Sequence, residues 1–303
     1  MPKMSATMLC ALALVATTGC SVKKFAIAKL GDSLASGGVT YAADDDPDLV
    51  GQALPFSLKL VEGLLAEVPE HRGLLFTATS GFTEYAYVYV HQDADMLQKQ
   101  DFEKASALRS RARRLYLRAR GYGLRGLDVR LRGFSRKLKE DPAAAVRLAR
   151  ASDVPFLYWT AAAWGSAISI SKDDVALVAD QRIVEALIDR AAELQPDFES
   201  GAIDGFLIVY EMVRTGAPGD AATRARMHFD RAVALSKGQL ASPFVSLAEA
   251  VSVQHQNRAE FETLLARALA VDPDARPEWR LQNLVSQRRA RWLLATADDL
   301  FIK

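Results

Sequence analysis

A charge-free stretch near the middle of the chain limits the folds that this sequence can adopt. Residues Val154–Ser171 read VPFLYWTAAAWGSAISIS, and Pro155 suits the first turn of a helix. A helix without charge must be buried on most sides, or it must span a membrane, for which about 18 apolar residues is the lower limit. Its Ser, Thr, Gly and Ala residues make it weakly hydrophobic on insertion scales. We therefore interpret it as the central helix of an all-α protein.

Apolar residues recur at three- and four-residue spacing on both sides of this stretch. The pattern predicts helices over residues 49–68, 72–91 and 97–121, and the last of these is expected to be interrupted at Gly121 and Gly123. The run Tyr85–Val90 alternates like a strand, but we predict a helix because it continues a longer helical pattern and has no hairpin partner nearby. No segment shows a βαβ rhythm.

Three predicted helices end in a similar way. The segments are LLAEVPEH (Leu64–His71), AAELQPDF (Ala191–Phe198) and ALAVDPDA (Ala268–Ala275). A helix that ends at a proline before a polar turn and a new helix is typical of tetratricopeptide (TPR) repeats. The prolines are not spaced by multiples of the 34-residue repeat. Residues 49–303 are therefore predicted to form antiparallel helix pairs in a degenerate TPR-like array around the central apolar helix.

The N-terminus is a different kind of sequence. Lys3 precedes an apolar run, Met8–Ala16, and Gly19-Cys20 then offers a cleavage site, so residues 1–19 are predicted to be a secretory signal peptide. The Gly19-Cys20 junction resembles the lipobox of bacterial lipoproteins, although Thr17 stands where leucine is usual. We predict a lipidated Cys20, with residues 20–48 as a tether to the membrane; the alternative is an ordinary signal peptide.

These predictions determine the expected location and exclude several chemistries. Ser21 favours the outer membrane in Gram-negative sorting, so we expect a periplasm-facing lipoprotein of the cell envelope. The chain has two cysteines, Cys10 and Cys20. Removal of the signal and lipidation would leave no thiol for a disulfide, a metal site or catalysis. Export also argues against nucleic acid as a partner.

No enzyme motif is present. The four histidines form no HxxxH pair, and there is no GxSxG or P-loop pattern. We therefore expect no catalytic residues, no metal and no cofactor.

Five segments, in order along the chain, carry a resemblance to a known family. They are SGFTEYAYVYV (Ser80–Val90), RARRLYLRARGYGLRGL (Arg111–Leu127), DVPFLYWTAAAWG (Asp153–Gly165), HFDRAVALSKGQLASPFVSLAEAV (His228–Val251) and RLQNLVSQRRARWLL (Arg280–Leu294). Together they resemble the T-component (TatT) family of tripartite ATP-independent (TRAP) transporters. The resemblance implies an all-α, TPR-like lipoprotein that forms a homotrimer, with a channel or cavity through each protomer. It also implies pairing with a periplasmic solute-binding subunit of the transporter.

Aromatic residues are the candidates for lining such a cavity. Phe82, Tyr85 and Tyr89 share one helical face, and Tyr158, Trp159 and Trp164 lie on the central helix. Aromatic rings can wall an apolar pocket whose few polar groups orient a ligand. Plain core packing is the alternative at each of these positions.

Basic residues are concentrated in one segment. Lys104–Lys139 contains ten arginines and three lysines against one acid, Asp128. The arginines that can share one helical face are Arg111, Arg114, Arg118 and Arg125. They could face an anionic ligand, lipid headgroups or an acidic partner protein, or they could form a solvated salt-bridge lattice.

Two functions remain open from the sequence. The first is a TRAP transporter accessory that docks the solute-binding protein and accepts or passes a small anionic or partly apolar ligand. The second is a structural TPR-like scaffold for protein–protein interaction at the envelope, with no ligand path.

Overall fold

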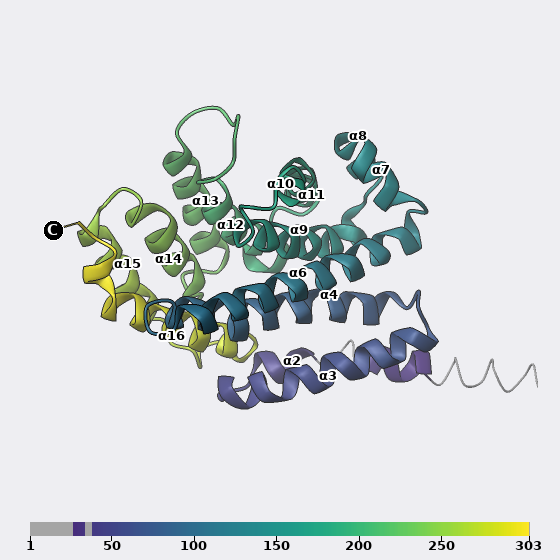
Figure 1. Ribbon diagram of the computed structural model, residues 1–303, viewed down its shortest axis with the longest axis horizontal. Helices are drawn as coiled ribbons and strands as arrows, with labels where there is room; N and C mark the ends of the chain where they lie inside the picture. The colour runs from purple at the N-terminus through teal and green to yellow at the C-terminus, as the bar shows by residue number, and fades with distance from the viewer. Residues whose placement is uncertain (1–26, 34–37, 303) are drawn as a thin grey trace, which may run out of the picture.

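The computed structural model describes residues 27–33 and 38–302 and shows an all-helical protein (Figure 1). Within these two ranges there is no β-strand, so the predicted all-α class is confirmed. The relation of the helix pairs to TPR repeats stays a prediction. Cys20 and the signal peptide lie outside the described residues.

The first helical hairpin is built from the predicted helices on either side of Pro69. Helix α3 (Pro47–Glu67) begins at Asp46, whose carboxylate accepts hydrogen bonds from the N–H groups of Asp48 and Leu49. Helix α4 (Arg72–Ala86) packs against it. The segment that alternates like a strand is helical, as predicted: it forms a π-helical turn, η1 (Tyr87–His91), which continues into α5 (Gln92–Leu97).

The arginine-rich segment forms one long helix, α6 (Phe102–Arg130), which passes through Gly121 and Gly123 without a break. The expected interruption was wrong, and packing explains why glycine is used. A Cβ on Gly123 would collide with Thr160, and one on Gly126 would collide with Phe156. Both contacts belong to the central helix, α9 (Val154–Ser169), so these glycines allow two helix backbones to approach closely.

Helices α4, α6, α9 and α11 (Gln181–Leu194) pack in series around the first hydrophobic core, which includes the fully buried Trp164, Tyr116 and Phe134. Short helices lie at its edge: α7 (Phe134–Glu140), α8 (Pro142–Val146) and α10 (Val175–Val178). The central helix is therefore a core helix, as expected. Helix α3 is the described helix that is long and apolar enough to cross a membrane, although little of it is buried.

A second core lies in the C-terminal half. Its helices are α12 (Ala202–Tyr210), α13 (Ala221–Leu235), α14 (Ser242–Leu247) with the π-helical turn η4 (Ala248–Ser252), α15 (Arg258–Leu269) and α16 (Arg280–Ala295). Helix α16 returns to the first half, where Arg288 donates to the carbonyl of Val88 at 3.2 Å. It also packs on α2 (Gly38–Ala42) (Figure 1). The two halves thus meet along α12 and again along α16.

Candidate functional site

The predicted arginine face lies on the outside of α6, where most of its members hold the first hairpin. Arg111 donates to the hydroxyl of Tyr85 at 3.1 Å, and Arg125 donates to the carbonyl of Pro69 at 2.9 Å. The Arg118 guanidinium lies 3.6 Å from Glu62. Arg114 is exposed and has no hydrogen bond or ion pair within the described parts of the chain.

The aromatic residues predicted on the first hairpin lie beneath these arginines. Phe82 stacks on Tyr122 with ring centroids 6.0 Å apart, and Arg118 lies 5.4 Å from the Phe82 ring centroid. Tyr85 and Tyr89 contact each other, and the Tyr89 ring fills the space beside Gly51 of α3. These three aromatic residues therefore pack between α3, α4 and α6.

The aromatic residues of the central helix are divided between two environments. Trp164 is fully buried, and the Arg120 guanidinium lies 4.5 Å from its ring centroid. Tyr158 and Trp159 are only partly buried and contact each other with ring centroids 5.1 Å apart. Tyr158 also contacts Phe198, which precedes Glu199.

Glu84 of α4 and Tyr87 of η1 lie on the helical face opposite Phe82 and Tyr89, and solvent reaches both side chains. The side chain of Glu84 is exposed to solvent on one side. The protein atoms packed around its carboxyl group, together with the negative charge of Glu199, raise its pKa to about 7. Tyr87 is 47% exposed, and burial likewise raises its pKa. Solvent therefore reaches both side chains, while neighbouring protein atoms still disfavour their charged forms.

Glu199 lies near Glu84. Its side chain is exposed to solvent on one side. The protein atoms packed around it raise the pKa of its carboxyl group, and the nearby Trp159 partly offsets that rise. Burial raises the pKa of Tyr158, and the charges of Glu199 and Glu84 add to the effect. Tyr158 therefore lies close to both carboxylates. We define the recess by Glu84, Tyr87, Tyr158, Trp159 and Glu199.

Two features of the recess carry a cost in folding free energy. Glu199 and Ser200 adopt positive φ values of 43° and 56°, which non-glycine residues adopt only when their surroundings impose them. Neither Glu84 nor Glu199 has an ion-pair partner in the described segments of the chain, although a desolvated carboxylate is normally paired. Such costs are concentrated at functional sites.

Near Tyr87, ion pairs connect the N-terminal and C-terminal halves of the molecule. Arg289 of α16 donates to Glu249 at 2.6 Å and to Asp95 at 3.1 Å. Burial lowers the pKa of the Arg289 guanidinium, but the negative charges of Glu249 and Asp95 raise it by more. The pKa of this group is therefore raised overall. Tyr87 lies in η1 and Glu249 in η4. Two π-helical turns thus lie near the same place, and such turns are frequent at functional sites.

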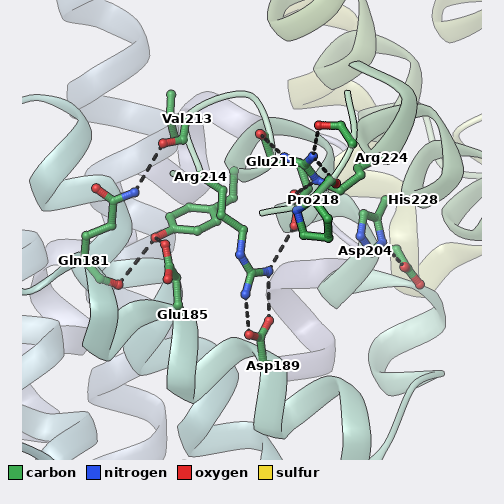
Figure 2. A network of polar contacts seen from close by, with 12 residues as sticks. Gln181, Glu185, Asp189, Asp204, Glu211, Val213, Arg214, Pro218, Arg224 and His228 are labelled. Carbon is green, nitrogen blue, oxygen red and sulfur yellow. Dashed lines mark hydrogen bonds and ion pairs between the residues drawn. The ribbon is translucent and has the colours of Figure 1, made fainter. Parts of the chain in front are cut away.

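A second polar cluster joins α11, α12 and α13 (Figure 2). Arg214 bonds to Asp189 and at 3.0 Å to Glu211, and Glu211 also accepts from Arg224 at 2.5 Å. Burial alone would raise the pKa of Glu211, but the two arginines outweigh it and the pKa is lowered. These charges, of which Glu211 is the buried one, satisfy one another, so the cluster serves as a structural link between helices.

The sequence pointed to the aromatic and arginine residues but missed the carboxylates of the recess. One signal was available for Glu84, which is the only charged residue between Gly73 and Val90. Glu199 and Arg289 lie in ordinary polar segments and had no such signal. Within the described ranges, no group of three or more His, Cys, Asp or Glu side chains could hold a metal ion.

Comparison with known proteins assigns the chain to a family. An uncharacterised protein of Treponema pallidum (strain Nichols) is 30% identical over 302 residues, which cover 94% of each chain. Residues 43–301 match the sequence profile of the family described as "TRAP transporter T-component". The match covers both hydrophobic cores. The chain therefore belongs to the TRAP transporter T-component family.

Proposed function

We propose that this accessory component docks a periplasmic solute-binding protein and accepts or passes a small ligand through the recess. The observation that carries the proposal is the position of Glu84, an exposed acid with a raised pKa and no ion pair among the described residues, near Glu199 and the contacting rings of Tyr158 and Trp159. Family membership supports the link to the transporter.

The charges of the recess also bear on the ligand. The arginines predicted to attract an organic anion lie on the outer face of α6, and most of them contact other groups of the protein. The recess itself carries two acidic side chains, neither with an ion pair among the described residues, beside the rings of Tyr158 and Trp159. Aromatic faces and carboxylates attract cations and bind apolar groups. The recess therefore favours a partly apolar ligand that is neutral or positively charged.

The location belongs to the same proposal. A lipid on Cys20 would hold the protein on the outer membrane with its body in the periplasm, and the homotrimer of the family remains a prediction for this chain. The Cys20→Ser variant should be released from the membrane fraction of cells. If it still sediments with membranes as the native protein does, the anchor lies elsewhere.

The experiment that tests the function compares recess variants with a surface variant. Glu84→Gln keeps the size of the side chain and removes its charge, and Trp159→Ala removes one wall. Both should reduce transporter-dependent uptake at least several-fold while pull-down of the solute-binding protein is retained. Arg114→Glu reverses a charge on the open surface, and it reports on whether the arginine face docks the partner.

Thermal unfolding of each variant shows whether the fold survives, because a surface change normally costs under about 0.5 kcal/mol. If all three variants stay folded, bind the partner and support normal uptake, the transport proposal fails. The alternative, a structural scaffold without a ligand path, would then stand.

A further inference from the structure

Helix α3 carries an apolar stripe on its outer side. Leu49 is 56% exposed, Phe56 75% and Leu60 41%. Their spacing of seven and four residues places them on one helical face, and the exposed Gly63 and Glu67 continue it. Three large apolar side chains in a row are more than the scattered single residues of an ordinary surface. This outer face of α3, defined by Leu49, Phe56 and Leu60, has no partner in the described structure.

The opposite face of α3 is part of the protein core. Val50, Leu58, Val61 and Leu65 are buried, and the helix packs on α4. The 21-residue helix passes the length and hydropathy test for a membrane span, but it cannot leave the core without exposing these residues. Of its charged residues, Lys59 and Glu62 pair at 2.6 Å to one side of the stripe. The helix is therefore suited to lie along an apolar boundary rather than to cross it.

The described part of the chain begins beside this helix. Residues 27–33 form a helical segment at the turn between α3 and α4, where the His71 side chain lies 3.1 Å from the carbonyl of Ala28. Cys20 is seven residues before Ile27, and seven residues reach at most about 25 Å when fully extended. A lipid on Cys20 would hold this edge of the molecule within that distance of the bilayer. Helix α3 forms the same edge, opposite α13 and α10 (Figure 1).

We propose that the outer face of α3 lies on the surface of the membrane that holds the lipidated Cys20, with Phe56 inserted among the lipids. This inference rests on the lipid anchor of the proposed function. A short tether and an apolar face on one edge act as two signals, and two signals give more stable membrane attachment than one. Binding at this face also fixes the orientation of the protein, with α13 and α10 turned away from the bilayer.

The cysteine content allows a direct test. The chain has no cysteine after Cys20, so Phe56→Cys gives the lipidated protein one free thiol for an environment-sensitive fluorophore. The lipidated protein is placed in vesicles of phosphatidylethanolamine and phosphatidylglycerol, with and without doxyl-labelled lipid. The matched control is Val175→Cys. Val175 is 80% exposed and belongs to α10, the helix that lies opposite α3 in Figure 1. We expect a blue shift and quenching by doxyl lipid at position 56 and neither effect at position 175.

Two outcomes would overturn the proposal. A probe at position 56 that stays water-exposed on vesicles shows that the face is not on the membrane. A probe at position 56 that is already shielded in the lipid-free Cys20→Ser protein, together with a trimer by light scattering, shows that a second copy of the chain covers the face.

A second variant keeps these results separate from the proposed function. Phe56→Glu with Leu60→Glu should abolish the doxyl quenching of a probe at Leu49→Cys, while pull-down of the solute-binding protein is unchanged. If the anchor itself is absent, the native protein will not stay with vesicles at all, which is a different result from an anchored protein with an exposed α3.

Discussion

The arginine face of α6 and the recess differ in how their charges are used. Helix α6 looks like the functional surface because of its many positive charges, yet Arg111, Arg118 and Arg125 all contact other groups of the protein. The recess as defined holds two acidic side chains, Glu84 and Glu199, and neither forms an ion pair in the described part of the chain, where burial raises the pKa of both. The number of charges in a segment therefore says little about which charges are available to a ligand. Availability depends on the partners that the fold supplies.

The first prediction compares the stability contributions of two tryptophans of α9, one in the core and one at the recess. Trp164 is 1% exposed, whereas Trp159 is only partly buried at the recess. Trp164→Ala should lower the free energy of unfolding by about 3–5 kcal/mol, as expected for a large aromatic residue removed from a core. Trp159→Ala should cost less and act mainly on uptake. Denaturant unfolding of both variants measures this, and equal losses would show that Trp159 is a core residue.

The second prediction concerns a paired charge near the arginine-rich helix. Asp153 is fully buried and accepts from Arg130 Nε at 2.7 Å and from the N–H of Arg150 at 2.9 Å. Burial would raise its pKa, but these donors outweigh it and the pKa is lowered. Asp153→Ala should cost about 3 kcal/mol of stability, because it leaves buried donors without an acceptor.

The exposed Asp173 on the same half of the molecule provides the control for this change. Asp173→Ala should stay within about 0.5 kcal/mol of the native protein. Chemical denaturation at pH 7 measures both variants. If Asp153→Ala is as mild as its control, the arginine contacts of α6 contribute little to the fold.

The smallest expected effect is the contribution of Glu84 to the pH dependence of the free energy of unfolding. Its pKa is about 7 in the folded protein against 4.5 as the ordinary value, so the folded state binds more protons between these pH values. The stability of the folded state therefore falls as pH rises from about 4.5 to about 7 and is level above that range. Glu84→Gln should remove this part of the decline.

The measurement is the free energy of unfolding at pH 5 and pH 8 for the native protein, Glu84→Gln and the control Glu70→Gln. Glu70 is exposed in the turn after α3. The control should keep the pH dependence of the native protein. The same dependence in Glu84→Gln would show that the recess does not desolvate this carboxylate.

Local pattern was enough to predict much of the fold. The 3.6-residue spacing of apolar residues gave the helices, because each helix of a globular protein buries one face. The charge-free stretch was correctly interpreted as a core helix for the same reason. The expected break at Gly121 and Gly123 failed because glycine has two uses, ending a helix and admitting a neighbouring backbone. Only the position of α9 showed that Gly123 serves the second.

The candidate site could be predicted in part only. Tyr158 and Trp159 were named from their place on the central helix and contact each other there, and their role as lining of a ligand cavity stays a prediction. Phe82, Tyr85 and Tyr89 share a face as predicted, but that face meets α3 and α6. One helical face looks like another in sequence, and the neighbours of each face are decided by the packing of distant segments.

By itself, the sequence determined the helical class, the central helix, the common face of the arginines and the resemblance to the T-component family. Each of these depends on residues within a few turns of one another, or on similarity along the whole chain. The tertiary structure decided which charges are paired and where the recess lies. Arg289 and Asp95 are 194 residues apart in the sequence, and Glu84 and Glu199 also come from distant segments. Electrostatic pairing and desolvation depend on distance in space, and for such residues only the fold determines that distance.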